Sequence, residues 1–366
     1  MLPTRPGMKR VAVDLSPLSP GGFNGGIKTA LYATLRFIEG LPDCGLQLAV
    51  YARASVHEEI APLLRNGRLF SCEEGEVPGS VDSADVCYCP VGFSTFIRAQ
   101  KPTIALITDT LHRDHPYYLP ADQVSRREVM CQETLQHVDR VQAISQWTAN
   151  QVYHHFGFPA ERVFVSRPLV HNRWAGVQEE PSGIPQPYFI YPANFWPHKN
   201  HETLLVAYRI YRENCGVSER PWSLILTGFP NDRLRYLQHI TAVLRLDDVH
   251  FVGHVSEGRF IGLLRRAGAM IFPSLYEGLG LPLLEAMSNG CPVLTGDHAA
   301  IPETAGSAAM KTETRNPALL AESMFALASQ PDLRAHLITN GLGHARACDP
   351  EIECAHLVRE LRELAN

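Results

Sequence analysis

Two glutamates set eight residues apart, Glu277 and Glu285, could grip the hydroxyl groups of a sugar. The apolar run 269–272 before them predicts a short buried strand, and Pro282 suits the first turn of a helix. The loop between strand and helix carries glycines, and its free N–H groups with the helix dipole could hold a diphosphate. The alternative is that Glu285 only complements the helix dipole while Glu277 is a solvated loop residue.

A lysine that could balance the charge of a leaving diphosphate follows the first strand expected in the second half of the chain. Lys199 lies in the segment 191–200, before an expected helix. A lone lysine is usually a solvated surface residue. The aromatic and proline residues of this segment favour an ordered loop, and therefore a functional lysine.

A glycine-rich segment, 20–26, lies between the first expected strand and the first expected helix. Its doublets, which end in Gly25 and Gly26, match neither the dinucleotide-binding spacing nor the Walker spacing. This argues against a dinucleotide dehydrogenase and against a kinase. A flexible connection and a ligand-binding loop both remain open.

A polar cluster follows the strand expected to end at Ile107. Asp109 would accept a hydrogen bond from a sugar hydroxyl. His112 and His115 have a spacing that fits no standard metal site, so we interpret them as residues of a cleft rim or of the surface.

Alternating apolar strands and helical patterns predict βα units with parallel sheets, and hence an α/β fold of two doubly wound Rossmann-like domains facing a cleft. The expected strands are 10–13, 46–51, 86–88, 104–107, 141–144 and 163–166, then 188–191, 223–226, 249–252, 269–272 and 292–294. The expected helices include 27–38, 126–138, 148–156 and 350–364. The expected parts are an N-terminal domain 1–170, a polar proline-rich linker 171–187, a C-terminal domain 188–345 and a terminal segment 346–366. Ligands of such sheets bind at the carboxyl ends of the strands, where all the residues above are expected.

The composition narrows the class of protein. A length of 366 residues suggests two domains, and a net charge of −5 excludes the basic surface typical of nucleic-acid binders. Apolar stretches such as 104–107 are too short to span a bilayer, and Lys9-Arg10 is followed by no secretory apolar region. The sequence therefore predicts a cytoplasmic protein whose only membrane contact would be peripheral, on the inner face.

Nine cysteines, an odd number without a signal peptide, argue for reduced thiols. Cys87 and Cys89 form the only close pair, and no second pair completes a zinc site. We interpret them as apolar residues of a buried strand and expect neither a metal nor a cofactor.

Taken together, these motifs resemble the retaining glycosyltransferases of family four, which have the GT-B fold, over about residues 11–345. The pair Glu277 and Glu285 is similar to the E-x7-E motif of that family, followed here by a Gly-Cys-Pro-Val turn at 290–293 and a Pro-Glu pair at 302–303. Lys199 resembles the phosphate-binding lysine of the family. Gly25 and Gly26 resemble its N-terminal glycine loop.

The resemblance implies roles for these residues. Glu277 would contact the donor sugar and Glu285 the ribose hydroxyls, while Lys199 and the loop amides would hold the diphosphate. Transfer would proceed on one face of the sugar, with the leaving phosphate helping to deprotonate the acceptor and no metal required. The first domain would form the acceptor side and the second would bind the nucleotide sugar, and the final helix would cross back onto the first domain. The implied catalytic residues are Lys199, Glu277 and Asp109, and the implied donor-binding residues are Gly25, Gly26, Asn194, Lys199, Glu277, Gly278, Leu279, Gly280, Leu281 and Glu285.

Two positions depart from the family pattern. Asn194 stands where the family often has an arginine, which removes one positive charge from the diphosphate site. Thr108 stands where the family often has a histidine, which changes how the C6 side of the sugar is held. Either change could mark a specialised acceptor or a weakened enzyme.

The resulting hypothesis is transfer of a hexose from a nucleotide diphosphate sugar to a saccharide or lipid-linked saccharide. The segment 191–201 looks most like bacterial enzymes of surface-polysaccharide assembly, such as those of lipopolysaccharide, which favours mannose from GDP-mannose. UDP-glucose and UDP-N-acetylglucosamine are the next donors. The rival hypotheses are a sugar-nucleotide epimerase, which would need a further base, and a non-catalytic partner subunit.

Overall fold

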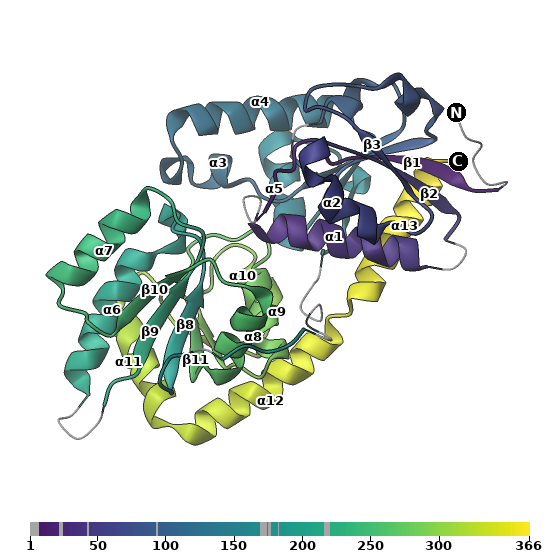
Figure 1. Cartoon of the computed structure of the whole chain (residues 1–366). Helices are drawn as coiled ribbons and strands as arrows, with labels where there is room; N and C mark the ends of the chain where they lie inside the picture. The colour runs from purple at the N-terminus through teal and green to yellow at the C-terminus, as the bar shows by residue number, and fades with distance from the viewer. Residues whose placement is uncertain are drawn as a thin grey trace. The chain divides into compact units, whose positions relative to one another are not determined.

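The computed structural model describes residues 7–21, 25–41, 44–92, 94–168, 174, 177–181, 183–215 and 220–366. The chain forms two compact units (Figure 1). Unit 1 consists of Met1–Val170 together with Asp349–Asn366, and unit 2 of His171–Cys348.

Unit 1 is built on a seven-stranded parallel sheet with the order β3-β2-β1-β4-β5-β6-β7. Val11 in the central strand pairs with Leu48 on one side and Val86 on the other, and all three are buried. Apolar residues fill both faces of these strands, as expected for a parallel sheet covered by helices. The strands are β1 Lys9–Asp14, β2 Leu46–Ala52, β3 Arg68–Ser71, β4 Val86–Cys89, β5 Thr103–Ile107, β6 Arg140–Ala143 and β7 Val163–Val165.

The helices of unit 1 include one from the far end of the sequence. The α-helices are α1 Gly25–Gly40, α2 His57–Ile60, α3 Leu111–Asp114, α4 Ala121–His137, α5 Gln146–Phe156 and α13 Pro350–Leu364. Short 3₁₀ turns are η1 Ala54–Val56, η2 Ala61–Leu63, η3 Gly79–Ser83, η4 Thr95–Arg98, η5 Pro116–Tyr118 and η6 Ala160–Arg162. α13, yellow in Figure 1, lies against α1. Ser166 Oγ donates to Glu353 O over 2.8 Å and Lys9 Nζ donates to Ala365 O over 2.9 Å, which fixes both ends of α13.

Unit 2 has a six-stranded parallel sheet with the order β10-β9-β8-β11-β12-β13. Its strands are β8 Tyr188–Pro192, β9 Ser223–Thr227, β10 Val249–Gly253, β11 Ala269–Phe272, β12 Val293–Thr295 and β13 Met310–Lys311. Its helices are η7 Pro197–Lys199, α6 His201–Asn214, α7 Arg233–Val243, α8 Glu257–Arg266, α9 Leu281–Ser288, α10 Ile301–Ala305, α11 Pro317–Ser329 and α12 Pro331–Ala347. Trp174 packs on Phe260 of α8, so the segment before β8 begins against this unit.

The eleven strands expected from the sequence are all present, with ends that shift by at most one residue. Two further edge strands, β3 and β13, were not expected. β13 has only two residues and β3 is only partly buried along its length, so neither shows a clear apolar alternation. α4 begins at Ala121, five residues before the expected start.

In each sheet, chain order reverses direction next to the first strand of the unit. This switch point lies between β1 and β4 in unit 1, and between β8 and β11 in unit 2. Open α/β sheets bind their ligands outside the carboxyl ends of the strands at such points. The loops after these four strands are therefore where site residues belong.

Candidate functional site

The switch point of unit 2 brings together Lys199 and Glu277, which are 78 residues apart in the sequence. Lys199 ends η7 in the connection after β8, and Glu277 lies in the loop after β11. Lys199 Nζ donates to Glu277 Oε1 over 2.6 Å. The two side chains are only 17% and 11% exposed, so little water screens the pair.

Three backbone-directed contacts hold this lysine in place. Asn200 adopts a left-handed conformation with φ +60°, which asparagine tolerates better than most residues, and its Nδ2 donates to Pro273 O (3.2 Å) and Thr314 O (2.9 Å). Leu275 N donates to His198 O over 2.8 Å. The loop after β8 is thus stapled to the loop after β11 from both sides of Lys199.

Tyr191 adds two hydrogen bonds to the connection between these loops. Its hydroxyl donates to Lys199 O over 2.9 Å and shares a 2.9 Å hydrogen bond with Ser274 Oγ. The buried ring of His201 packs on those of Tyr191 and Phe195, with centroids 4.9 Å and 5.2 Å away. Burial, helped by the charge of Lys199, lowers the pKa of His201 to about 3, so this ring is neutral. The sequence analysis did not identify Tyr191 or Asn200 as positioning residues. Asn200 could have been identified, because it directly follows Lys199 and asparagine tolerates a left-handed conformation.

The loop that follows Glu277 opens α9. Gly280 has φ +90°, a conformation that disfavours any side chain, and turns the chain into the helix. The N–H groups of Leu279, Gly280 and Leu281 have no acceptor among the described residues, as is usual where a helix begins. Gly278 completes the loop. An anion placed here would meet free donors and the positive end of the helix dipole.

Glu285 lies one turn into α9 and is only 5% exposed. A carboxylate this deeply placed needs hydrogen bonds to compensate for the water that it loses on folding. Asn194 follows β8, and its Oδ1 accepts from Phe229 N over 2.7 Å. A side chain at Gly228 would come within 2.3 Å of Ala193 O, so this glycine permits the close approach of the two loops.

In unit 1 the predicted residues are engaged locally. Asp109 Oδ1 accepts from Leu111 N and from Arg127 Nη1, each over 3.0 Å. Its Oδ2 has one contact among the described residues, with Thr108 Oγ1 at 3.4 Å. Half of this carboxylate is therefore committed to the fold, and the other half faces no strong internal donor.

The prediction that His112 lies on a cleft rim or on the surface is wrong. It is 3% exposed, with its ring 6.2 Å from that of Phe156 and its Nε2 3.6 Å from Glu128 Oε2. The short helix α3 turns this side chain inward against its neighbours, which a polar segment read without its fold does not reveal. Burial lowers the pKa of His112, although the carboxylates of Asp109 and Glu128 act to raise it.

The glycine segment at the end of β1 is only partly described, since residues 22–24 lie outside the described residues. Gly25 begins α1 with φ +59° and Gly26 follows it. Lys28 Nζ donates to the backbone oxygens of two residues that precede this stretch, Ser19 O (2.8 Å) and Gly21 O (2.9 Å). One side of the segment is thus held by a buried lysine that the sequence left without a role.

Glu59 completes this anchor. It forms an ion pair with Lys28, accepts from Gly21 N over 3.0 Å and from Tyr32 Oη over 3.0 Å. Burial acts to raise the pKa of Glu59, but the hydrogen bonds from Lys28, Gly21 and Tyr32 lower it overall. Lys28 and Glu59 are therefore a structural pair, and Lys28 is not a phosphate ligand.

Among the described residues, no group of three or more His, Cys, Asp or Glu side chains is placed to hold a metal ion. Within the same ranges, no helix has the length and apolar character that crossing a bilayer requires.

The sequence profile of the family described as glycosyl transferases group 1 matches residues 174–343, which include Lys199, Glu277 and Glu285. The matched residues all lie within unit 2.

Similar proteins include two that are named O-antigen chain mannosyltransferases. O-antigen chain mannosyltransferase B of Escherichia coli is 25% identical over 240 residues, which cover 63% of this chain and 62% of that protein. O-antigen chain mannosyltransferase RfbU of Salmonella typhimurium is 24% identical over 199 residues, covering 54% of this chain and 53% of that protein. The matched region thus spans less than two thirds of the length of these relatives.

Solved structures share the fold over nearly the whole chain. A glycosyltransferase from Rickettsia africae superposes with a TM-score of 0.74 at 12% identity, covering 98% of both chains. HepE of Anabaena in complex with UDP-glucose superposes with a TM-score of 0.73 at 16% identity, covering 97% of this chain and 99% of that one. The predicted fold class, an α/β GT-B fold, is confirmed.

Proposed function

We propose that this protein is a group 1 glycosyltransferase that moves a hexose from a nucleotide diphosphate sugar to an acceptor hydroxyl, with retention and without a catalytic metal. The observation that carries the proposal is the pair of Lys199 and Glu277 beside the free N–H groups that open α9. One positive group, one carboxylate and a helix N-terminus together match a diphosphate joined to a sugar.

Lys199 has the donors that a diphosphate needs. An ammonium group has three N–H donors, and the described residues engage one of them, through Glu277. A bound diphosphate would take the other donors, and the sugar hydroxyls would turn to Glu277. Asn194, with its oxygen engaged by Phe229 N, would offer its NH₂ group to the same ligand.

In the proposed reaction, the bond between the sugar C1 and the diphosphate oxygen breaks, and its electron pair stays on that oxygen. Lys199 and the amides of the Gly278–Leu281 loop stabilise the charge that builds there. The acceptor hydroxyl attacks C1 from the same face, and its proton passes to the leaving phosphate. Glu277 orients the sugar, Glu285 the ribose, and Asp109 a further sugar hydroxyl.

The favoured donor is GDP-mannose. The relatives that support it are named O-antigen chain mannosyltransferases. UDP-glucose is the alternative, because the HepE structure of the same fold was determined with it. The acceptor would be a saccharide or a lipid-linked saccharide. None of the relatives or structures described above is named an epimerase, and we do not propose that reaction.

A thermal-shift panel tests the donor site. GDP, UDP, ADP, dTDP and the common sugar conjugate of each nucleotide are added separately to the protein in the presence of EDTA. We expect stabilisation by GDP and GDP-mannose above the other nucleotides. Stabilisation by UDP alone would replace the donor, and stabilisation by none would overturn the proposed function.

Retention is tested on the product. Transfer from GDP-α-mannose to an aryl mannoside is followed by proton and carbon NMR of the anomeric position. We expect an α-linked product. A β-linked product would contradict retention while leaving the glycosyltransferase activity in place.

A further inference from the structure

The loop between Glu277 and α9 is held by the residues that begin and form α10. Ala300, the residue before α10, donates its N–H to Glu277 O over 3.3 Å. Thr304, within α10, donates its hydroxyl Oγ1 to Leu279 O. Two carbonyl oxygens of the loop are therefore turned toward α10, and the peptides that carry them are fixed in direction.

The contact made by Thr304 sets the direction of one N–H group. Leu279 O and Gly280 N–H belong to the same trans peptide, so they point in opposite directions. Because the oxygen faces Thr304, the N–H faces away from α10. Gly280 N–H has no acceptor among the described residues, although Leu279 and Gly280 are both buried. A donor in such a place needs an acceptor, and a bound anion would supply one.

The same peptide could also adopt the opposite orientation, because glycine accepts φ of either sign. Gly280 has φ +90°, and half a turn of the peptide would give it a negative φ that glycine adopts as readily. The turned peptide would present Leu279 O where the N–H had been, and a carbonyl oxygen repels an anion. The hydrogen bond from Thr304 therefore favours the orientation that binds an anion.

Thr304 is itself firmly held. Its side chain belongs to a residue that is 3% exposed. Its backbone N–H donates to Ala300 O over 3.1 Å, and its carbonyl accepts from Nε2 of His344, in α12, over 2.8 Å. The hydroxyl thus reaches Leu279 from a backbone that is fixed at both of its polar groups, which is the support that a positioning residue requires.

We propose that Thr304 is a positioning residue for the nucleotide diphosphate: through Leu279 it keeps the N–H of Gly280 directed at the phosphate oxygens. This inference rests on the proposed function and adds to it a residue that touches no ligand itself. The sequence analysis noted the Pro-Glu pair at 302–303, directly before Thr304, but gave the threonine no role.

The test uses inorganic pyrophosphate, which contains the diphosphate without a base or a sugar. We expect Thr304→Val to weaken its binding to the full chain about fivefold to tenfold, because Leu279 O loses its donor and no longer fixes the peptide. Thr304→Ser keeps a hydroxyl and should bind as the unchanged chain does. Calorimetric titration measures these affinities. Thr304→Ala removes the same hydroxyl and carries the same expectation if Thr304→Val does not fold.

A matched control removes a buried hydroxyl elsewhere in unit 2. Thr241 Oγ1 donates to Leu237 O within α7 over 2.8 Å, and Thr241 is buried. Thr241→Val should therefore bind pyrophosphate as the unchanged chain does.

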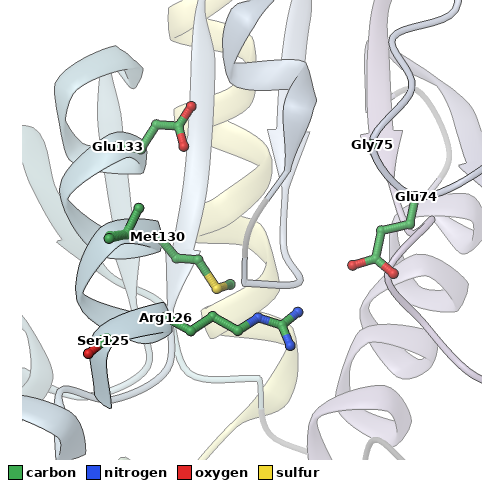
Figure 2. A pocket seen from close by; sticks show the side chains of 7 residues that line it. Glu74, Gly75, Ser125, Arg126, Met130 and Glu133 are labelled. Atoms are coloured by element: carbon green, nitrogen blue, oxygen red, sulfur yellow. The ribbon is translucent and has the colours of Figure 1, made fainter. Parts of the chain in front are cut away.

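A second control addresses binding of pyrophosphate to an arginine outside the donor site. Figure 2 shows Arg126 reaching from α4 into a pocket of about 700 Å³ in unit 1, with Glu74 pointing back toward it. The nearby carboxylate disfavours an anion there. Arg126→Gln should therefore leave the binding of pyrophosphate unchanged. A loss of binding in Arg126→Gln would place the pyrophosphate in unit 1 and overturn the inference.

A spectroscopic measurement follows the N–H of Gly280 directly. The sequence contains two Leu-Gly pairs, at 279–280 and 342–343. Isotope labels on leucine carbonyl carbons and on glycine nitrogens therefore give two signals in an HNCO spectrum, and Gly343→Ala identifies them by removing one. We expect pyrophosphate to shift the Gly280 signal and to leave the Gly343 signal in place. In Thr304→Val the shift of the Gly280 signal should be lost.

The outcomes distinguish this inference from the proposed function. Equal binding of pyrophosphate by Thr304→Val and the unchanged chain, or equal loss in Thr304→Val and Thr304→Ser, would overturn the role of the hydroxyl and leave the donor site in place. No binding of pyrophosphate by the unchanged chain, or an unshifted Gly280 signal, would overturn the role of the Gly280 N–H. No stabilisation by any nucleotide would count against the proposed function, whereas the pyrophosphate titration would still decide the role of Thr304.

Discussion

Unit 1 pairs Lys28 of α1 with Glu59 of α2, and unit 2 pairs Lys199 with Glu277 in the loops at its switch point. The two pairs differ in how many lysine donors remain available for a ligand. In unit 1, Lys28 pairs with Glu59 and donates to two backbone carbonyls, so all three of its donors are in use. In unit 2, Lys199 donates to Glu277 alone among the described residues. Both lysines are poorly exposed and lie near glycines, yet only Lys199 retains donors for a ligand.

This difference shows that residue type and a nearby glycine loop do not define a site. A lysine with every donor engaged stabilises a loop, whereas one with donors in reserve can bind a transient charge. The same contrast separates Glu59, which accepts from two neutral donors as well as Lys28, from Glu277, whose described hydrogen bond is to Lys199.

The largest expected effect is at the two lysines. Lys199→Met should lower turnover by about 100-fold to 1,000-fold, because charge on the leaving diphosphate loses its counter-charge. Lys28→Met should lower the free energy of unfolding by about 1–3 kcal/mol, because Glu59 and two carbonyls lose a donor. Initial rates with GDP-mannose and urea unfolding of each variant measure the two effects.

Lys311→Met is the matched control, since Lys311 forms an exposed pair with Asp297. It should leave both rate and stability nearly unchanged. The comparison fails if Lys199→Met retains normal turnover, or if Lys28→Met loses turnover as severely as Lys199→Met while remaining fully stable.

The next effect concerns Glu285 and nucleotide affinity. Glu285→Ala should weaken binding of GDP by about 10-fold to 150-fold, because two ribose hydroxyls lose a charged acceptor worth about 1.5–3 kcal/mol. Calorimetric titration with GDP measures the change. Glu322→Ala, on the exposed side of α11, is the control and should not alter affinity. Unaltered affinity in Glu285→Ala would remove the ribose role.

The two buried histidines extend the comparison to pH. The pKa of His201 is lowered to about 3, and its neighbours Lys199 and Arg233 are positive; the pKa of His112 is also lowered, but its carboxylate neighbours oppose the shift. Between pH 6.5 and the folded pKa, the unfolded chain binds the proton and the folded chain does not. Stability is therefore full above pH 6.5 and falls as the pH decreases, by at most about 1.4 kcal/mol per unit for one histidine.

When the pH decreases from 6.5 to 5, His201 should thus lower the free energy of unfolding by about 2 kcal/mol. Urea unfolding at both values should show a smaller loss for His201→Gln than for the unchanged chain. His112→Gln should relieve less of the loss than His201→Gln does. The reverse order would mean that the carboxylates of Asp109 and Glu128 do not limit the decrease in the pKa of His112.

Much of the architecture could be predicted from the sequence, because buried parallel strands are continuous apolar runs. The helix 350–364 has the expected bounds. The short edge strands β3 and β13 were missed because edge strands bury little surface.

The strand, the glycine-containing loop and the helix around Glu277 and Glu285 were predictable, because this short segment contains its own apolar run and turn residues. Long-range contacts were not, since nothing local indicates that Lys199 meets Glu277 or that Glu59 reaches Lys28. The burial of His112 and the engagement of Asp109 by Arg127 also depend on helix packing. Polar residues in unit 1 therefore need the structure before a role can be assigned.

The smallest expected effect is at Asp109 and Arg127 in unit 1. Asp109 is proposed both to hold Arg127 and to bind a sugar hydroxyl. Asp109 Oδ1 is occupied by Leu111 N and Arg127, while Oδ2 has only the 3.4 Å contact with Thr108. Arg127 is 41% exposed, so its ion pair should contribute about 0.5–1 kcal/mol to stability.

A double-mutant cycle separates the two uses of Asp109. Asp109→Asn and Arg127→Gln should each remove the same coupling energy in urea unfolding, with no further loss when combined. In transfer assays they should differ: Asp109→Asn should lower kcat/KM about fivefold, the worth of one weakened hydrogen bond, and Arg127→Gln should not. Equal effects of the two changes on kcat/KM would show that Asp109 acts only by holding Arg127, and would leave the sugar-binding side of unit 1 without a carboxylate.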